Sequence, residues 1–244
     1  MRNVKLVIEY DGTDYAGWQI QPNGVSIQEA VQDAIAEITG ERNVRLIGSG
    51  RTDAGVHAAG QAANFKTDTN IPAEDLVHAI NTKLPPDVAI LDAEDVPDDF
   101  HAQYSAISKT YRYTILNRPV RSPLERNRWY LARQPLDTDA MRAAAAHLIG
   151  ELDFAAFQSK PNGKPSIRTV TRLDVEASGS RIEITISANG FLYNMVRAIV
   201  GTLVEVGLGK REPDSIPDLL RSKDRSAAGP TAPPHGLRLL EVEY

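Results

Sequence analysis

One short run of the chain combines residue types that could do chemistry on a sugar or a base. Residues 48–57 read GSGRTDAGVH, which places the carboxylate of Asp53 two positions from the guanidinium of Arg51. In an extended stretch, residues two apart point the same way, and flanking glycines let a substrate approach the backbone closely. The pattern is compatible with a loop that offers a carboxylate beside a cation.

Two other interpretations of this run compete with that one. A dinucleotide-binding loop of the GxGxxG type fails, because Asp53 occupies the third glycine position and its carboxylate would repel a pyrophosphate. A plain turn is the commoner meaning of Asp-x-Gly, since both residues favour turns. Composition alone does not choose between a plain turn and a loop that presents Asp53 to a ligand.

The composition excludes several catalytic classes. The chain of 244 residues has no cysteine, which removes disulfides, thiolate zinc sites and cysteine nucleophiles. Its five histidines are not spaced as HxH or HxxxH, so we expect no metal site. No run approaches the roughly 20 apolar residues of a membrane helix, and the first ten residues alternate like a strand. We therefore expect a cytoplasmic protein without membrane contact.

The charge of the chain is unevenly distributed. The net charge is −5, yet residues 109–133 contain seven basic residues and one acidic residue, and residues 72–100 contain eight acidic residues and one basic residue. Such polarity could present a basic face to phosphates. A solvated arginine-rich loop explains the charge equally well.

The apolar periodicity predicts strand–helix–strand units in each half of the chain. Ser26 to Glu29 reads as a capping box and Gly40 as a helix stop. We expect an α+β fold of two similar subdomains, residues 1–105 and 106–244, that share a central, mostly antiparallel sheet flanked by helices. The expected strands are 4–10, 44–47, 60–66, 110–116, 169–177, 181–188 and 237–242, and the expected helices are 27–39, 72–84, 138–148, 191–206 and 214–222.

Several segments together resemble the TruA family of tRNA pseudouridine synthases, in order and spacing nearly end to end. The resemblance implies the pseudouridine synthase fold and an isomerase that acts without cofactor or metal. It implies conversion of uridine to pseudouridine at positions 38 to 40 of the tRNA anticodon stem-loop. The segments are GRTDAGVH (50–57), YDGT (10–13), GWQ (17–19), FHA (100–102), KTYRY (109–113), NGFLYNMVR (189–197), GPTAP (229–233) and GL (236–237).

The same resemblance assigns roles to four residues. It makes Asp53 the catalytic carboxylate, and Arg197 the cation that keeps this carboxylate ionised. Tyr111 becomes the active-site tyrosine, although its strand position alone favours an aromatic residue that fills the core. Arg51 becomes the residue that occupies the space of a target uridine flipped out of its stem.

The resemblance also implies partners, namely the tRNA anticodon arm and a second copy of the chain in a homodimer. Gln103 stands where the family often has arginine, and Ile20 departs similarly after GWQ, so the RNA grip is expected to differ there. The candidate RNA contacts are Gln103, Lys109, Arg112, Arg126, Gln158, Ser159 and Lys160.

Two further functions are alternatives. Residues 6–13 superficially resemble the start of haloacid-dehalogenase phosphatases, but Glu9 stands in place of the nucleophilic aspartate, so a strand that ends in an Asp-Gly turn is favoured. A tRNA-binding chaperone without catalysis is the second alternative. The presence of Arg51, Asp53, Tyr111 and Arg197 together argues against the chaperone.

Overall fold

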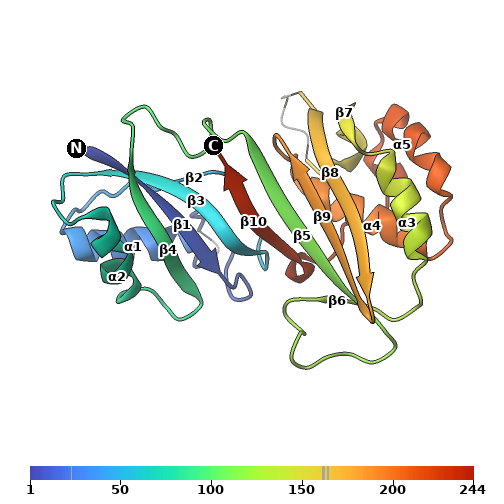
Figure 1. Cartoon of the computed structure of the whole chain (residues 1–244), viewed down its shortest axis with the longest axis horizontal. Coiled ribbons are helices and arrows are strands. Elements are labelled where there is room, and N and C mark those ends of the chain that lie inside the picture. The colour runs from blue at the N-terminus through green and yellow to red at the C-terminus, as the bar shows by residue number, and fades with distance from the viewer. Residues whose placement is uncertain (23, 161–162, 164) are drawn as a thin grey trace. The chain divides into compact units, whose positions relative to one another are not determined.

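The computed structural model of the chain describes residues 1–22, 24–160, 163 and 165–244. The chain divides into two compact units, one formed by residues 1–107 with 238–244 and the other by residues 108–237. Each unit combines helices with a mostly antiparallel sheet, and the α+β class is thereby confirmed (Figure 1). Within these described residues, no helix is long and apolar enough to cross a bilayer.

The first unit is built on the strand order β4-β1-β3-β10, and β2 also pairs with β3. The β3–β10 pair is parallel and the other pairs are antiparallel. Val4, Leu6 and Ile8 of β1 are fully buried, as their alternation along a strand predicts. The bounds are β1 Arg2–Tyr10, β2 Ile47–Gly48, β3 His57–Thr67, β4 Val88–Val96, β10 Leu237–Glu243, α1 Ile27–Thr39 and α2 Ala73–Asn81.

Helix α1 begins and ends where local chemistry predicts. The Glu29 N–H donates to Ser26 Oγ at 3.2 Å, and the Ser26 N–H donates to Glu29 Oε2 at 3.5 Å, which completes the capping box. Gly40 ends the helix with a φ of 73°, a left-handed value that glycine adopts without strain. Both predicted boundaries of this helix are confirmed.

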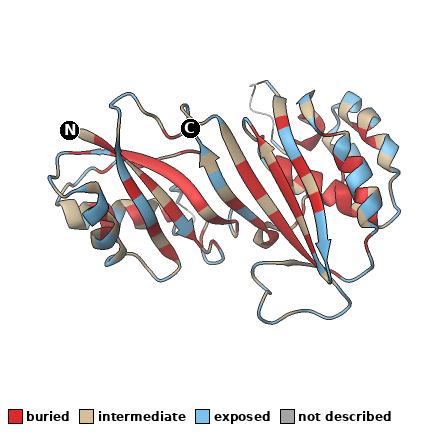
Figure 2. Ribbon diagram, viewed as in Figure 1, coloured by how far each residue is buried: buried red, intermediate tan, exposed pale blue. Residues whose placement is uncertain are grey.

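The second unit has the strand order β5-β9-β8-β7 with antiparallel pairs, and β6 pairs in parallel with β5. Ile182, Ile184 and Ile186 of β9 are buried, as their alternation predicts. Eleven residues of α4 are buried, so this helix lies in the core of the unit (Figure 2). The bounds are β5 Ser108–Asn117, β6 Tyr130–Ala132, β7 Gly150–Asp153, β8 Ile167–Ser178, β9 Arg181–Ala188, α3 Thr138–Ala146, α4 Met195–Gly207 and α5 Ile216–Ser222, with short 3-10 turns at Ala155–Phe157, Pro213–Ser215, Arg225–Ala227 and Pro234–Gly236.

Several predicted boundaries are wrong. Helix α4 begins at Met195 and not at residue 191, because Asn194 before it adopts a left-handed φ of 61° that interrupts helical backbone. The strand expected at 44–47 is confined to Ile47–Gly48, and α2 and α3 end at Asn81 and Ala146, earlier than expected. The pattern also missed three strands: β4, β6 and β7.

The proline-rich segment before β10 packs tightly against α4. A Cβ on Gly201 would lie 1.7 Å from the carbonyl oxygen of Pro230, so only glycine allows the two backbones to come this close. The Gly229 N–H donates to Thr202 Oγ1 at 2.9 Å, and the Ala232 N–H donates to the carbonyl oxygen of Arg197 at 3.0 Å. The segment is therefore fixed to the buried helix.

We predict that Gly201→Ala lowers the free energy of unfolding by about 1–3 kcal/mol or more, because the added methyl forces α4 and the Pro230 backbone apart. Denaturant unfolding followed by circular dichroism would measure this. The matched control is Gly190→Ala, where the nearest atom to an added Cβ is a side-chain nitrogen of Arg168 at 3.6 Å, an ordinary contact. Equal stability of the two variants would contradict the close approach.

Candidate functional site

The segment that contains Asp53 leaves β2 and enters β3, and its first residues are anchored to β3. The Ser49 N–H donates to the Ala62 carbonyl at 2.7 Å, and the Ser49 hydroxyl donates to Gln61 Oε1 at 2.7 Å. Gln61 Nε2 then donates to the carbonyl oxygen of Gly50 at 3.0 Å. Ser49 and Gln61 are both fully buried, so these bonds are shielded from water and the start of the loop is fixed.

The middle of the loop is anchored through Thr52. Its hydroxyl shares a buried hydrogen bond of 2.8 Å with the hydroxyl of Tyr10, at the end of β1. Its carbonyl accepts the Trp18 N–H at 3.1 Å. Burial raises the pKa of Tyr10 well above its usual range, so the phenol stays protonated and available for this bond. Thr52 is thus held on both its side chain and its backbone.

Two glycines let the N-terminal segments press directly against the loop. A Cβ on Gly17, whose φ is +103°, would lie 2.6 Å from the carbonyl oxygen of Thr52. A Cβ on Gly12 would lie 2.1 Å from the carbonyl oxygen of Val56. The Gly12 N–H also donates to Nδ1 of His57 at 3.1 Å. Segments 10–13 and 17–19 therefore form the support of the Asp53 loop.

Asp53 lies in a turn at the surface of this support. The Val56 N–H donates to the Asp53 carbonyl at 3.1 Å, and Gly55 within the turn has a φ of +76°. Asp53 is partly exposed, and Arg51 is exposed. Asp53 therefore lies in a turn and also has a partly exposed carboxylate, so the two interpretations of the Asp-x-Gly pattern do not exclude one another.

In the second unit, Tyr111 is held on β5 by an aromatic neighbour. Its side chain is 8% exposed, and its ring meets that of Phe191 edge to face, with centroids 5.1 Å apart at 89°. Tyr113, two residues later, is fully buried and donates its hydroxyl to the Pro233 carbonyl at 2.8 Å. Burial raises the pKa of Tyr113 well above its usual range. Tyr113 is thus a core residue, and Tyr111 lies at the margin of the core.

Arg197 occupies the first turn of α4 in a fixed geometry. Its Nε donates to the carbonyl oxygen of Ala232 at 2.7 Å, and its Nη1 donates to Asn194 Oδ1 at 3.1 Å. Its neighbours Val196 and Ile199 are buried, so the guanidinium is restrained at the edge of an apolar helix. Asp53 belongs to the first unit and Arg197 to the second, and their pairing stays a prediction.

The loop after the 3-10 turn 155–157 contains three of the candidate RNA contacts. Gln158 is 6% exposed, and its Nε2 donates to the carbonyl oxygen of Lys160 at 3.1 Å. The Ser159 N–H donates to the Tyr193 carbonyl at 3.2 Å. The Nζ of exposed Lys160 lies 5.6 Å from the centroid of the Tyr193 ring, within cation–π range. Gln158 supports this loop from inside, while Lys160 faces solvent.

The remaining candidate RNA contacts differ in exposure and pairing. Lys109 is half-buried, and loss of hydration lowers its pKa to about 8. Arg112 donates through Nε to Thr185 Oγ1 at 3.3 Å. Arg126 is exposed and donates through Nη1 to the Pro123 carbonyl at 2.9 Å. Gln103 is exposed in the first unit, in the turn after FHA.

The supporting residues were missed by the sequence analysis. Tyr10, Gly12, Gly17 and Trp18 were recognised only as parts of family-like segments, without a physical role. Two glycines and three aromatics within nine residues, before a loop rich in glycine, are the signal that could have indicated a close backbone contact. For metals, no group of three or more His, Cys, Asp or Glu among the described residues is placed to bind an ion.

Comparisons with known proteins identify the family of the chain. A family model described as tRNA pseudouridine synthase matches residues 6–105 and 144–244. Three relatives align with the chain over the full length of both proteins. The tRNA pseudouridine synthase A of Thermoanaerobacter sp. (strain X514) is 54% identical to the chain. The tRNA pseudouridine synthase A 2 of Clostridium perfringens (strain 13 / Type A) and the tRNA pseudouridine synthase A of Geotalea daltonii (strain DSM 22248 / JCM 15807 / FRC-32) are each 51% identical. The chain belongs to the tRNA pseudouridine synthase A (TruA) family.

We predict that Tyr10→Phe loosens the Asp53 loop, because the hydroxyl of Thr52 loses its buried partner at a cost of about 1–2 kcal/mol. Hydrogen exchange should then accelerate at the amides of Trp18 and Val56, which bond to the loop backbone. Tyr104→Phe is the control, since Tyr104 is 78% exposed. Unchanged exchange at both amides in Tyr10→Phe would show that this hydroxyl does not fix the loop.

Proposed function

We propose that the chain isomerises uridine to pseudouridine at positions 38 to 40 of the tRNA anticodon stem-loop, with Asp53 as the catalytic carboxylate. The observation that carries the proposal is identity of 54% and 51%, over the full length, with relatives named tRNA pseudouridine synthase A. The anchored loop around Asp53 supports the assignment of the carboxylate. A cytoplasmic location and a homodimer are parts of the same proposal.

The reaction needs a positioned carboxylate more than it needs an external reactant. The bond between the sugar and a uracil nitrogen breaks, the base rotates, and a bond forms from the sugar to a ring carbon. That carbon loses its proton and the freed nitrogen gains one, so atoms and electrons balance within the substrate. An ionised aspartate can attack or stabilise an electron-poor carbon. Attack on the sugar, addition to the base and a glycal route are all compatible with Asp53.

The rigid support of Asp53 matters for this chemistry because a fixed catalytic group avoids reorganisation during the reaction. The buried bond between Tyr10 and Thr52 lies one residue from Asp53, and the turn closed by Val56 lies immediately after it. The carboxylate is therefore attached to a constrained backbone on both sides, while its side chain remains partly exposed for substrate.

Tyr111, Arg197 and Arg51 are assigned to the handling of the target uridine. The ring of Tyr111 stacks on the base or its hydroxyl assists proton transfer, and the edge contact with Phe191 favours a single ring orientation. Arg197 pairs with the ionised Asp53. Exposed Arg51 fills the space left in the stem when the uridine flips out.

Binding of tRNA is assigned mainly to contacts with the phosphate and sugar backbone of the RNA, and less to recognition of base edges. Exposed Arg126, Lys160 and Gln103 are accessible to phosphates. Nη1 of Arg112 lies 3.7 Å from Oε1 of Glu183, and this ion pair partly neutralises the positive charge that Arg112 can offer to a phosphate. The side chain of Gln158 is used within its own loop, so its role is to support Ser159 and Lys160. A tRNA-binding chaperone would use these contacts without turnover, and the Asp53 experiment separates the two functions.

We predict that Asp53→Asn abolishes pseudouridine formation, by at least about a thousandfold, because the amide cannot act as a carboxylate nucleophile or base. Carbodiimide mapping of pseudouridine in an unmodified tRNA transcript, with no added cofactor, measures the product. Filter binding should give the same tRNA affinity as the unaltered chain. Asp99→Asn, an exposed carboxylate of the same unit, is the control and should keep full turnover. Substantial turnover by Asp53→Asn would remove Asp53 from its role.

We predict that tRNA affinity falls about tenfold between pH 7 and pH 9 through Lys109. With a pKa of about 8 in the free protein, Lys109 is about nine-tenths charged at pH 7 and about one-tenth charged at pH 9. A phosphate binds only the charged amine, so a neutral Lys109 must first take up a proton. Lys109→Arg stays charged and should flatten the pH response. The same pH slope in both proteins would show that Lys109 does not contact the RNA.

A further inference from the structure

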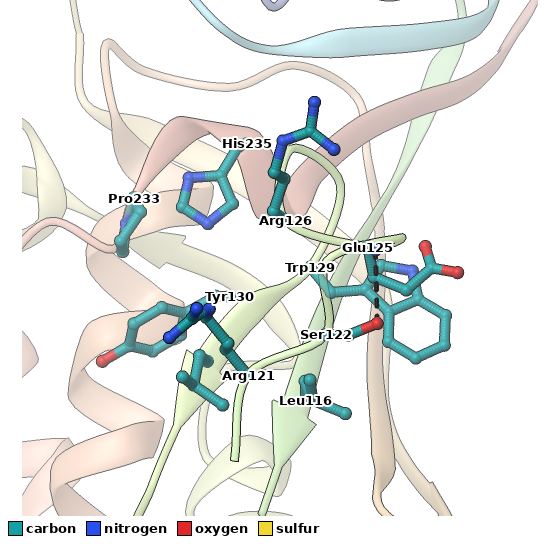
Figure 3. A pocket seen from close by; sticks show the side chains of 10 residues that line it. Leu116, Arg121, Ser122, Glu125, Arg126, Trp129, Tyr130, Pro233 and His235 are labelled. Atoms are coloured by element: carbon teal, nitrogen blue, oxygen red, sulfur yellow. Dashed lines mark hydrogen bonds between the residues drawn. The ribbon is translucent and has the colours of Figure 1, made fainter.

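The second unit contains a cavity outside the residues assigned to the target uridine. It lies between the loop that joins β5 to β6 and the turn before β10, with a volume of about 300 Å³, at the lower end of the range for ligand pockets (Figure 3). The lining residues are Leu116, Arg121, Ser122, Glu125, Arg126, Trp129, Tyr130, Leu131, Pro233 and His235.

Aromatic and aliphatic side chains form part of the lining. Trp129 and Tyr130 are consecutive and both half-buried, and Leu116 at the end of β5 is 4% exposed. The ring of Tyr130 meets that of the buried Tyr113 at 73°, with centroids 6.4 Å apart, which favours a fixed orientation. Aromatic faces in a basic surface are the feature that stacks single-stranded bases.

Two exposed arginines belong to the lining of the cavity. Arg121 and Arg126 are both exposed, and Figure 3 shows Arg126 beside His235, with Arg121 below them near Tyr130. Arg126 uses one donor on the Pro123 carbonyl, and a guanidinium has five, so others can reach a phosphate. The charge of the lining is therefore suited to an anionic ligand with a flat ring.

Groups that can read a base edge complete the lining. Glu125 and Ser122 both line the cavity, and the backbone N–H of Glu125 donates to Ser122 Oγ at 3.4 Å (Figure 3). A carboxylate accepts hydrogen bonds from exocyclic amino groups, as glutamate does with cytosine. An isolated phosphate would be repelled by Glu125, whereas a nucleotide offers a base edge to it and a phosphate to the arginines.

We propose that this cavity binds one unpaired nucleotide of the tRNA other than the target uridine, with its base against Trp129. The proposal rests on the proposed function in one respect, because the RNA is taken to be tRNA. Leu116 and Tyr111 are five residues apart on β5, about 17 Å along a strand. The cavity is therefore a second RNA contact of the unit, distinct from stacking at Tyr111.

The first test measures tRNA affinity without turnover, so that it stays informative if no pseudouridine is formed. In the Asp53→Asn protein, adding Trp129→Ala should raise the Kd for a tRNA transcript about tenfold, because loss of one stacked base costs about that factor. Trp129→Phe keeps a ring and should recover most of the affinity. Leu124→Ala, in the same loop and 89% exposed but outside the lining, is the matched control. Equal Kd values for Trp129→Ala and Leu124→Ala would overturn the proposal.

The second test uses the chain with Trp129 intact and so does not depend on how that variant folds. Irradiation of the complex with a tRNA transcript containing 5-bromouridine and 5-bromocytidine, followed by mass spectrometry, should give a crosslink to Trp129 or Tyr130 from a nucleotide outside positions 38 to 40. Crosslinks confined to other peptides would overturn the proposal. Uridine monophosphate and cytidine monophosphate provide the last arm: saturable quenching of Trp129 fluorescence by either, without any crosslink from tRNA, would mean a site for free nucleotides instead.

Discussion

The close approach of two backbone segments to the Asp53 loop is the constraint on which the candidate site depends. Gly12 and Gly17 have no Cβ. A Cβ atom added to either residue would lie 2.6 Å or less from a carbonyl oxygen of the loop. Because the glycines allow this approach, Tyr10 and Trp18 come close enough to form hydrogen bonds with Thr52. A flexible loop carrying the same carboxylate would lose conformational entropy on every encounter with substrate, whereas this loop is ordered by folding itself.

The same physical solution recurs in the second unit with different residues. Gly201 on α4 admits the Pro230 carbonyl, and the segment after it provides the acceptor for Arg197 Nε. In both units, a backbone group of a segment distant in sequence helps to hold the site: the Trp18 N–H donates to the carbonyl of Thr52, next to Asp53, and the Ala232 carbonyl accepts from Arg197 Nε. A backbone acceptor cannot change rotamer, so it fixes the guanidinium of Arg197 more firmly than a second flexible side chain would.

Local signals predicted much of the fold, and long-range contacts account for what they missed. The capping box at Ser26 and the isoleucine alternation of β9 act within a few residues, and both predictions are confirmed. Strand β4 was missed because it lies at the end of its sheet, where three of its four exposed positions are acidic and interrupt the alternation. The predicted start of α4 was wrong because residues 191–193 are compatible with a helix in sequence, and the left-handed backbone of Asn194 that ends this pattern is not evident from sequence.

The candidate site divides in the same way. The motif around Asp53 is contiguous, so it could be recognised from sequence alone. The bond from Tyr10 to Thr52 spans 42 residues, and no periodicity reports such a pairing. The aromatic and cationic cavity joins residues 116–131 to residues 233–235 and was invisible to sequence for the same reason. Sequence thus predicted the residues that have proposed roles in the reaction, and the structure added the contacts that hold them.

The segment that runs from Gly229 to His235 has a consequence for how the protein tolerates change. Within seven residues it bonds Thr202, accepts from Arg197, accepts from Tyr113 and lines a cavity. Three prolines fix its φ angles, so it has little slack with which to absorb an inserted or deleted residue. Its length is therefore more constrained than its composition, and natural variants should differ here by substitution and not by gaps.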